Sequence, residues 1–369
     1  MQKSKRKLGE IDFILFAAIL MLVSFGVLMV YSASSYFAAF QYNNAEYFLW
    51  KQLMYATVGT IAMIITMNID YHVYKRLTGK LMILTIILLL LVFIFPPVKG
   101  AQRWIRLGPL SFQPSEMAKY VVVLFVAKII EAKGEKIKQF KNGMLPCLSV
   151  AFLFAALVIA EKNLSIATII MLVSVAMLFV AGIDKKYIFG LAGSLVGLVA
   201  LAIIFEPYRM KRLIGFRDPW ADSQKTGYQL IQSLLALGSG GFIGVGIGQS
   251  RQKCFYIPEP HNDFIFAVIG EELGFIGCIF VIALFIVFLW RGIRTAVKAK
   301  DVYGSLLSTG ITAVVILQAI INIAVVTVSM PTTGVPLPFI SYGGSSLVIN
   351  MMAMGILLNI TRQNQYKSK

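Results

Sequence analysis

The sequence predicts an all-α polytopic membrane protein of ten transmembrane helices, and its composition and its apolar segments are the observations behind this prediction. Of the 369 residues, 58% are hydrophobic and 14% are charged. The mean hydropathy of +0.78 excludes an ordinary soluble domain. Ten apolar segments are long enough to cross a bilayer, and we expect residues 1–369 to form a single transmembrane domain. These segments lie near residues 11–33, 47–68, 78–97, 114–133, 143–161, 164–182, 187–206, 263–290, 304–329 and 341–361.

Lysine and arginine residues predict the orientation of the chain. They gather in the N-terminal tail of residues 1–10, in four loops and in the C-terminal tail of residues 362–369. With ten spans these positions all fall on one side, so the positive-inside rule predicts that both termini are cytoplasmic. We therefore expect a multi-pass protein of the cytoplasmic membrane. The basic positions are Lys3, Lys5, Arg6, Lys7, Lys75, Arg76, Lys80, the segment Lys128 to Lys141, Lys185, Lys186, the segment Arg291 to Lys300, Arg362, Lys367 and Lys369.

The formal net charge of +17 is spread over these short loops, so nucleic-acid binding has no support. Anionic membrane lipids are the simpler partner for such loops. The three cysteines, Cys147, Cys254 and Cys278, have neither the spacing of a disulfide framework nor that of a zinc site.

The first external loop, near residues 34–46, contains no lysine or arginine. The second, near residues 97–114, departs from the positive-inside pattern because it holds Lys99, Arg103 and Arg106. Its glycine and proline residues predict a structured turn segment. Trp104 fits an interfacial anchor, the commoner role of such a residue, and a substrate contact equally well.

Ionisable residues also mark the outer ends of the next three spans. Glu116 and Lys119 are three residues apart at the start of the fourth span, so they share a helix face. They could form a structural ion pair, or a charged wall that lines a cavity open to the outside. The fifth and sixth spans are joined by a tight external hairpin, Glu161-Lys162-Asn163.

The segment 207–262 is the large extracytoplasmic loop between the seventh and eighth spans. The stretch from Gly227 to Leu237 predicts an apolar helix that is too short to span and that suits a re-entrant or interfacial position. The glycine-rich stretch 238–248 is neither a P-loop nor a dinucleotide fingerprint. It could bring backbone N–H groups close to an anion, or serve only for flexible packing.

Asp263 stands where this polar loop gives way to an apolar helix. Glu271 and Glu272 follow eight and nine residues later, about 12 Å further along a helix. Charged groups at this depth are costly unless they face water, a partner or a substrate. Asp263 could serve only as a helix N-cap, but His261 and the two glutamates nearby favour a site.

The last external loop, from Met330 to Ser346, contains three prolines and three glycines between two spans. This composition predicts a fixed, partly buried broken segment. Such backbone is tolerated at membrane depth only where it lines a cavity or packs on protein.

All of these unusual polar features lie on the external side. Cationic groups, carboxylates and glycine-rich backbone there indicate a site for an anionic molecule carried by a lipid, such as a lipid diphosphate sugar. Such a molecule needs arginine or lysine for its diphosphate and an apolar groove for its tail. A carboxylate could then act as a general base on a sugar hydroxyl.

The motifs of the external side resemble those of the shape, elongation, division and sporulation (SEDS) family, and the likeness runs over nearly the whole chain. Two further stretches, Arg217-Asp218-Pro219-Trp220 and Gln232 to Gly241, resemble the division and sporulation (FtsW/SpoVE-like) branch more than the elongation branch. The motifs are Gly100-x-x-Arg103-Trp104, Gln113-Pro114-Ser115-Glu116-x-x-Lys119, Gly227-Tyr228-Gln229, Pro258-Glu259-x-His261-x-Asp263-Phe264-Ile265-Phe266 and Pro336-Leu337-Pro338-Phe339-Ile340-Ser341-Tyr342-Gly343-Gly344-Ser345-Ser346.

The resemblance implies a peptidoglycan glycosyltransferase of ten membrane helices, serving division or sporulation. It would polymerise lipid II on the outer face of the cytoplasmic membrane, with undecaprenyl diphosphate as the leaving group. Asp263 matches the family's catalytic Asp. The usual partner is a class B penicillin-binding protein, and a divalent cation, Mg²⁺ or Mn²⁺, would assist the leaving group. The residues expected to bind substrate are Arg103, Trp104, Glu116, Lys119, His261, Ser341, Gly343 and Ser345.

Two positions depart from the family pattern. Asn262 stands where the family commonly has Thr or Ser, and it keeps a polar side chain. The family's Glu/Gln-Pro-Asp-Leu-Gly-Thr hairpin is here Glu161-Lys162-Asn163-Leu164-Ser165-Ile166. This hairpin has lost an acid and gained a lysine, so the charge of the cavity changes by about two units, and cation or substrate binding could differ.

Two other classes of protein remain as alternatives. A lipid II flippase would also need a polar cavity, but a transporter places charged groups near the midplane with access from both sides. A scaffold that only recruits a penicillin-binding protein would not need Asp263, Glu116 and Lys119. The external clustering of these charges favours the enzyme.

Overall fold

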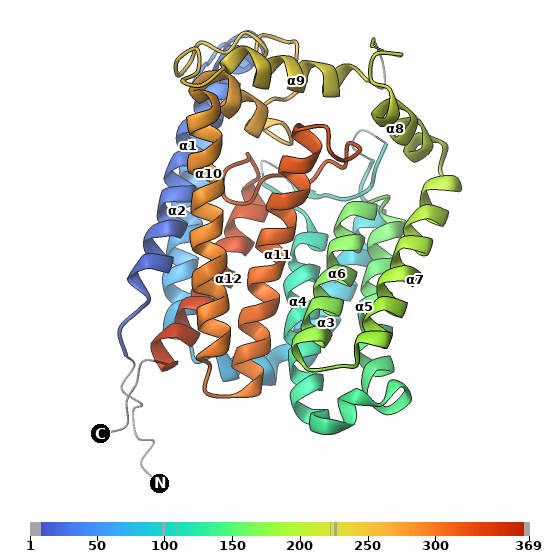
Figure 1. Ribbon diagram of the computed structural model, residues 1–369. Helices are drawn as coiled ribbons and strands as arrows, with labels where there is room; N and C mark the ends of the chain where they lie inside the picture. Colours follow the sequence, from blue (N-terminus) through green and yellow to red (C-terminus); the bar gives the residue numbers. More distant parts are fainter. Residues whose placement is uncertain (1–8, 98–99, 109, 222, 225–226, 365–369) are drawn as a thin grey trace.

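The computed structural model describes residues 9–97, 100–108, 110–221, 223–224 and 227–364, and this part of the chain is a bundle of helices (Figure 1). The basic residues Lys3, Lys5, Arg6, Lys7, Lys99, Lys225, Lys367 and Lys369 lie outside the described residues. The helices are α1 (Phe13–Tyr42), α2 (Tyr47–Asn68), α3 (Tyr71–Leu91), α4 (Pro114–Lys133), α5 (Leu145–Ala160), α6 (Leu164–Val180), α7 (Lys185–Ile204), α8 (Pro207–Arg217), α9 (Tyr228–Gly240), α10 (Ile265–Val297), α11 (Val302–Val326) and α12 (Gly344–Asn364). A small antiparallel hairpin pairs β1 (Ile105–Leu107) with β2 (Leu110–Phe112).

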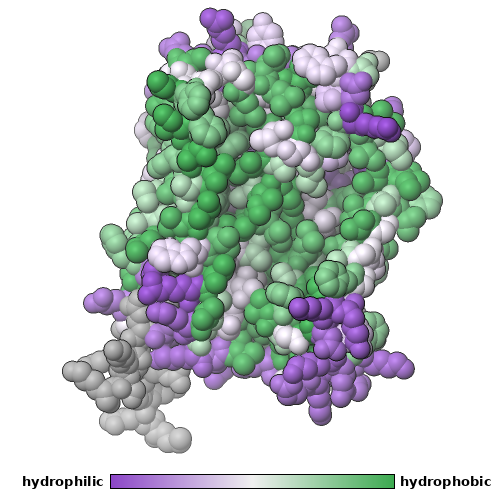
Figure 2. Space-filling view, viewed as in Figure 1, coloured by the Kyte–Doolittle hydropathy of each residue, from purple (hydrophilic) through white to green (hydrophobic). Residues whose placement is uncertain are grey.

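Each of the ten predicted spans coincides with one helix: α1 to α7 and α10 to α12. Among the described residues, eight helices are long and apolar enough to cross a membrane. The other two are α4, which carries Glu116, Lys119, Lys128 and Glu131, and α6, which has 17 residues. Hydrophobic residues cover the sides of the bundle, and hydrophilic residues gather at its ends (Figure 2). The chain is therefore a multi-pass, all-α membrane protein.

The two ends of the bundle differ. One end holds the start of α1, the end of α12 and the turn between α10 and α11 (Figure 1). We call it the basic end, because the described basic turns of the sequence lie there. The opposite end, which we call the α9 end, holds α8, α9 and the loop 241–263 (Figure 1). The segment before α1 is joined to the last turn of α12 at the basic end, where the Gly9 N–H donates to the Arg362 carbonyl at 3.1 Å.

Two expected boundaries were wrong. The first loop at the α9 end is only residues 43–46, because α1 continues to Tyr42, with Ser34 Oγ donating to the Val30 carbonyl at 2.6 Å. The helix ends at Asn43, whose φ of 50° is left-handed. Helix α3 begins at Tyr71 rather than near residue 78, because the side chain of Asp70 caps it by accepting from the His72 N–H at 3.0 Å.

Helix α10 is not continuous. Gly274 has φ 65° and ψ −161°, so the span expected near residues 263–290 is interrupted there. The glycine-rich loop supplies the missing backbone partners: Val245 N–H donates to the Glu271 carbonyl at 3.0 Å, and Phe275 N–H donates to the Gly241 carbonyl at 2.8 Å. A Cβ at Gly274 would lie 2.4 Å from the backbone nitrogen of Gly244, so this close approach requires glycine.

The last loop before α12 is a broken, buried segment, as expected from its prolines and glycines. Leu337 and Ile340 are both at most 1% exposed. The loop packs on α1, where a Cβ at Gly26 would lie 2.4 Å from the Phe339 carbonyl oxygen. Ser341 Oγ donates to the Asn262 carbonyl at 2.7 Å and accepts from the Leu337 N–H at 2.8 Å, so it joins this loop to the segment that leads into α10.

Candidate functional site

Asp263 lies in the turn directly before α10. The helix begins at Ile265 with Phe264 as its N-cap, so the interpretation of Asp263 as a mere N-cap is wrong. The backbone carbonyl of Asp263 is held by Asn322 of α11, whose Nδ2 donates at 2.7 Å and also donates to the Val335 carbonyl at 2.8 Å. The backbone at Asp263 is thus fixed between α11 and the last loop, independently of its carboxylate.

A cavity of about 150 Å³ at the α9 end has Asp263 in its wall. Its lining comes from α8, α9, α11, the loop before α10 and the last loop. Gly334 has φ +73°, and a Cβ placed on it would lie 3.4 Å from Asp263 Oδ2. The absence of a side chain at Gly334 therefore keeps the space next to the carboxylate open. The polar residues and the glycine that line the cavity include Arg212, Gln229, Glu259, Asn262, Asp263, Thr332 and Gly334.

Two arginines, Arg103 and Arg212, lie near the Asp263 carboxylate. Arg212 of α8 donates from a terminal nitrogen to the Thr332 carbonyl at 2.9 Å, and its guanidinium lies 4.5 Å from the centre of the Tyr208 ring. Burial and then the like charge of Arg212 lower the pKa of Arg103, while Glu161, Tyr208 and Asp263 oppose this effect. Arg103, Arg212 and Asp263 therefore lie within electrostatic reach of one another, as a diphosphate site requires.

The Glu161 hairpin joins the same region. Arg103 Nε donates to the Glu161 carbonyl at 3.3 Å, and its terminal nitrogen donates to the Lys162 carbonyl. Ser165 Oγ donates to the Thr333 carbonyl at 3.0 Å, which ties the hairpin to the last loop. Asn163, one of the departures from the family pattern, caps α6 by accepting from the Ile166 N–H at 3.4 Å. The other, Lys162, has φ 62°, which a proline cannot adopt.

The carboxylate of Glu161 is the most unusual acidic group of this region. It is 0% exposed, and neither oxygen has a hydrogen-bond partner within the part of the chain that the structure describes. Burial raises its pKa to about 8, and the charge of Arg103 opposes this effect. A buried acid with a raised pKa beside charged partners is typical of functional sites.

Glu116 and Lys119 form the ion pair expected from their spacing. The Lys119 Nζ lies 2.9 Å from Glu116 Oε2, which also accepts from Ser346 Oγ at 2.6 Å. Both residues are 1% exposed, so the expectation of a charged wall open to the outside is wrong. The start of α12 covers the pair, because Ser346 lies in its first turn.

The other residues expected at the substrate site do not line the Asp263 cavity. His261 is 2% exposed, and its ring centre lies 4.4 Å from that of Phe48. Ser345 Oγ accepts from the Gln113 N–H at 3.3 Å, and Gly343 lines a small void with Ser346. Trp104 is partly buried just before β1 and is not among the residues that line the Asp263 cavity.

Arg212, Glu161, Asn322, Thr332 and Gly334 were not among the predicted site residues. Arg212 is one of seven cationic residues in the segment 207–262, and its position in the sequence does not distinguish it. Asn322 did carry a signal, because a polar residue inside an apolar span is costly unless it has a structural or functional partner.

Comparison with known proteins places the chain among cell cycle proteins. The family model FTSW_RODA_SPOVE, described as "Cell cycle protein", matches residues 13–366. The chain is 43% identical over 365 residues to a "Probable peptidoglycan glycosyltransferase FtsW" of Geobacter sp. (strain M18), with 96% of this chain and 98% of the relative covered. It is also 43% identical over 361 residues to "Stage V sporulation protein E" of Bacillus subtilis (strain 168), with the same coverage.

Solved structures agree with this relationship. One belongs to work on "Structural coordination of polymerization and crosslinking by a peptidoglycan synthase complex"; its TM-score is 0.80 at 26% identity, with 97% of this chain and 99% of that chain covered. The crystal structure of the rod shape determining protein RodA of Thermus thermophilus has a TM-score of 0.71 at 25% identity, with 97% and 98% covered.

Proposed function

Because this chain belongs to the FtsW/RodA/SpoVE family of cell cycle proteins, we propose that it is a peptidoglycan glycosyltransferase that polymerises lipid II into glycan strands. The observation that carries the proposal is the Asp263 cavity. It places a carboxylate beside an open space, with two arginines in electrostatic reach, at the end of a membrane bundle. A lipid-borne diphosphate sugar needs this combination of charges.

In the reaction, the Asp263 carboxylate accepts the proton of the attacking sugar hydroxyl. The hydroxyl oxygen forms the new bond to the anomeric carbon, and the bond from that carbon to the diphosphate breaks. Undecaprenyl diphosphate leaves with the bonding electron pair. Arg103 and Arg212 stabilise the negative charge that develops on the diphosphate.

A divalent cation, Mg²⁺ or Mn²⁺, fits this site if one or two carboxylates bind it together with the phosphates of the substrate. Among the described residues, no group of three or more His, Cys, Asp or Glu side chains is placed to hold a metal. Mg²⁺ instead commonly uses one or two carboxylates together with substrate phosphates and retains several waters. Asp263 and Glu259 line the same cavity and provide such carboxylates. Bound there, the cation would supply further positive charge for the leaving group.

The proposed topology has ten transmembrane helices in a single domain covering residues 1–369. The described basic turns share one end of the bundle, so we assign that end, the N-terminal tail 1–10 and the C-terminal tail 362–369 to the cytoplasm. The α9 end, with the large loop 207–262 and the Asp263 cavity, then faces the outside of the cytoplasmic membrane.

The proposed partners are membrane lipids and a class B penicillin-binding protein, which would crosslink the strand that this enzyme makes. The similar solved structure comes from a complex that coordinates polymerization and crosslinking. Copurification with class B penicillin-binding proteins in mild detergent tests this part of the proposal.

Glycan synthesis from purified lipid II by the protein reconstituted in liposomes, with and without such a partner, tests the central proposal. We expect glycan strands and released undecaprenyl diphosphate. Lipid II transfer across the liposome membrane without any glycan product would instead indicate a flippase, and neither activity would indicate a scaffold.

A further inference from the structure

A second opening lies at the α9 end, separate from the Asp263 cavity. It is an open cleft of about 650 Å³ between the last turns of α1 and the loop from Gly248 to Tyr256. This volume is within the range of small-molecule sites. The residues of its lining that could contact a ligand are Ser35, Tyr36, Gln249, Arg251 and Tyr256.

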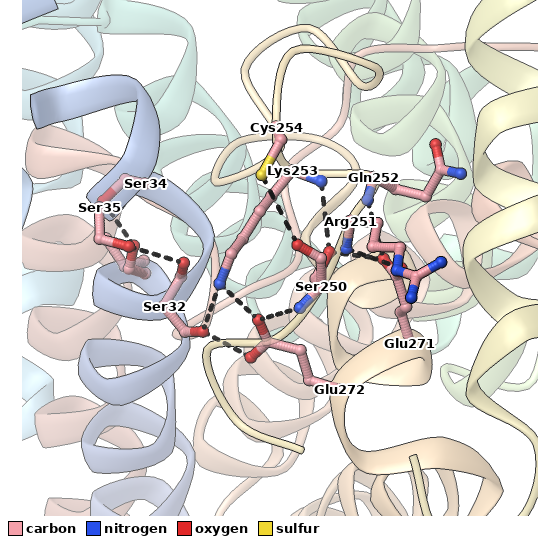
Figure 3. A network of polar contacts seen from close by, with 11 residues as sticks. Ser32, Ser34, Ser35, Ser250, Arg251, Gln252, Lys253, Cys254, Glu271 and Glu272 are labelled. Atoms are coloured by element: carbon pink, nitrogen blue, oxygen red, sulfur yellow. Dashed lines mark hydrogen bonds and ion pairs between the residues drawn. The ribbon is translucent and has the colours of Figure 1, made fainter. Parts of the chain in front are cut away.

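The loop that lines the cleft is held by two buried glutamates of α10, Glu271 and Glu272 (Figure 3). Glu272 accepts from Lys253 Nζ at 2.8 Å, and from Ser32 Oγ of α1 at 2.5 Å. Glu271 accepts from Ser250 Oγ at 2.5 Å and from the Arg251 N–H at 2.9 Å. The two glutamates are at most 2% exposed, so they serve this loop and not a substrate directly.

This network makes the cleft a preformed surface. Glu271 fixes the backbone of the loop by accepting from the N–H groups of Arg251 and Gln252. The side chains of Gln249, Arg251 and Tyr256 are exposed on this loop. Lys253 is 4% exposed and already paired with Glu272, so its charge is not presented to a ligand. The exposed cleft is therefore polar and aromatic, with the single guanidinium of Arg251, and it does not suit a free polyanion.

An aromatic cluster adjoins the cleft, and Tyr36 belongs to both. Phe255 makes edge-to-face contacts with Tyr36 and Phe40, at ring-centre distances of 5.4 and 5.3 Å. Phe255 has φ 66°, a left-handed conformation that is unusual for a bulky residue and that persists where the surroundings enforce it, often at functional sites. Phe37 connects this cluster to the reaction site, because its ring lies 6.2 Å from Phe255 and 6.0 Å from His261, two residues before Asp263.

We propose that this cleft binds sugar units of the glycan strand during its elongation. Tyr36 and Tyr256 offer amphipathic rings for the apolar faces of sugars, and the amide of Gln249 suits their hydroxyl and N-acetyl groups. Arg251 suits the carboxylates of the attached peptides. The cleft is open to solvent, and none of the described residues that line it is Leu, Ile, Val, Met or Phe, whereas a lipid-linked substrate also needs an apolar groove. This inference rests on the proposed function.

The test is direct binding of chitotetraose, a tetramer of β-1,4-linked N-acetylglucosamine, to the full-length protein in detergent. We expect the variant Gln249→Ala/Tyr256→Ala to bind chitotetraose about ten-fold more weakly than the wild type. The variant loses the contact of the Tyr256 ring with the sugar and the hydrogen bond of the Gln249 amide. The matched control is Gln41→Ala/Trp50→Ala, which removes an exposed amide and an exposed ring at the same end but outside the cleft. Arg251→Gln should weaken binding only of glycan fragments that carry peptides.

In liposomes with lipid II, the cleft variant should make shorter strands while the initial rate of lipid II consumption changes little. Equal chitotetraose binding and equal strand length in wild type and cleft variant would overturn the proposal. Because sugar binding needs no catalysis, it also separates this inference from the proposed function. A wild-type protein that binds chitotetraose but makes no glycan would overturn only the proposed function.

Discussion

The Arg103 guanidinium bonds the backbone of Glu161 and forms no ion pair with its carboxylate. Arg103 Nε donates to the Glu161 carbonyl at 3.3 Å, while both carboxylate oxygens of Glu161 lack a hydrogen-bond partner within the described residues. The guanidinium thus closes the hairpin between α5 and α6 and leaves a buried acid beside it. Since Asp263 also acts electrostatically on Arg103, this arginine links the hairpin to the Asp263 cavity.

The first prediction follows from the pKa of Glu161, which burial raises to about 8. In the folded protein Glu161 keeps its proton up to that pH, whereas in the unfolded chain it loses it near the ordinary value of 4.5. The contribution of Glu161 to stability is therefore fully present below about pH 4.5 and is lost as the pH rises through about 8. Glu161→Gln should flatten this decline in thermal unfolding scans in detergent between pH 5 and 9. The control, Glu135→Gln, changes an exposed glutamate at the basic end and should keep the wild-type slope. Identical slopes for Glu161→Gln and the wild type would contradict the raised pKa.

The second prediction concerns the space that Gly334 leaves next to Asp263. Gly334→Ala forces an alanine into φ +73° and places its Cβ 3.4 Å from Asp263 Oδ2. The backbone cost should be about 1 kcal/mol, and glycan synthesis should fall because the methyl group narrows the cavity. Gly182→Ala is the matched control, since Gly182 has φ +81° and its Cβ would meet nothing within 4 Å. Both variants should lose similar thermal stability, but only Gly334→Ala should lose activity. An active Gly334→Ala would show that the reacting groups do not use this space.

The third prediction concerns the hairpin that departs from the family pattern. A proline at position 162, as in the family, cannot adopt the φ of 62° seen for Lys162 and would remove the N–H that donates to the Ile159 carbonyl at 2.8 Å. Lys162→Pro should therefore lower stability by more than 1 kcal/mol, whereas Lys162→Gly, which suits a positive φ, should be tolerated. Thermal unfolding of the two purified variants provides the measurement. A stable Lys162→Pro would mean that the hairpin adopts the backbone of its relatives.

The fourth prediction uses the buried pair of Glu116 and Lys119. Lys119→Met leaves the Glu116 carboxylate, which is 1% exposed, without its cation. The substitution should lower the free energy of unfolding by roughly 3–5 kcal/mol. The double variant Glu116→Gln/Lys119→Met should recover much of this loss. The control is Lys138→Met, because Lys138 and Glu135 form an exposed pair with the same spacing, and such pairs contribute about 0–1 kcal/mol. No recovery in the double variant would contradict a structural ion pair, and low glycan synthesis in a stable double variant would indicate a role toward substrate.

The helices could be predicted from the sequence because an apolar run in a bilayer must satisfy its backbone hydrogen bonds within itself. The break at Gly274 could not, because its lost hydrogen bonds are replaced by residues 241–246, about 30 residues away in the chain. Glu271 and Glu272 were correctly identified as carboxylates that need partners. Their partners, Ser250 and Lys253, are known only from the tertiary structure.

In the candidate site, too, local features could be predicted from the sequence, whereas contacts between distant segments could not. Asp263 was predicted from a motif and from its place at a helix boundary, both of which are local features. Its cavity also needs Arg212 from α8 and Gly334 from the last loop, which are far apart in the sequence and line one cavity only in the tertiary structure. Conversely, His261 and Ser341 belong to recognisable motifs, but they join the loop before α10 to the last loop: the His261 carbonyl accepts from the Tyr342 N–H at 2.9 Å, and Ser341 Oγ donates to the Asn262 carbonyl.

The last prediction is that Asp263→Asn abolishes glycan synthesis and leaves the protein folded. Asparagine has nearly the same shape, and the bond from Asn322 to residue 263 uses the backbone carbonyl, so it survives the change. The N-cap of α10 is Phe264, so no cap is lost either, and stability should change by less than about 1 kcal/mol. An amide cannot accept the proton of the attacking hydroxyl or bind a cation as a carboxylate does. The rate should therefore fall by roughly 10²–10⁴-fold.

The control for this change is Asp218→Asn, which alters an acid of the same large loop. Asp218 Oδ1 accepts from the Trp220 N–H at 3.1 Å, and an asparagine supports the same turn, so activity should be kept. The measurement is the amount of glycan formed from lipid II by matched quantities of wild type, Asp263→Asn and Asp218→Asn, with thermal unfolding recorded for each. Equal product from wild type and Asp263→Asn would remove Asp263 from the chemistry. Loss of glycan synthesis in both variants would indicate that the negative charge of the loop is required, and not a general base at Asp263.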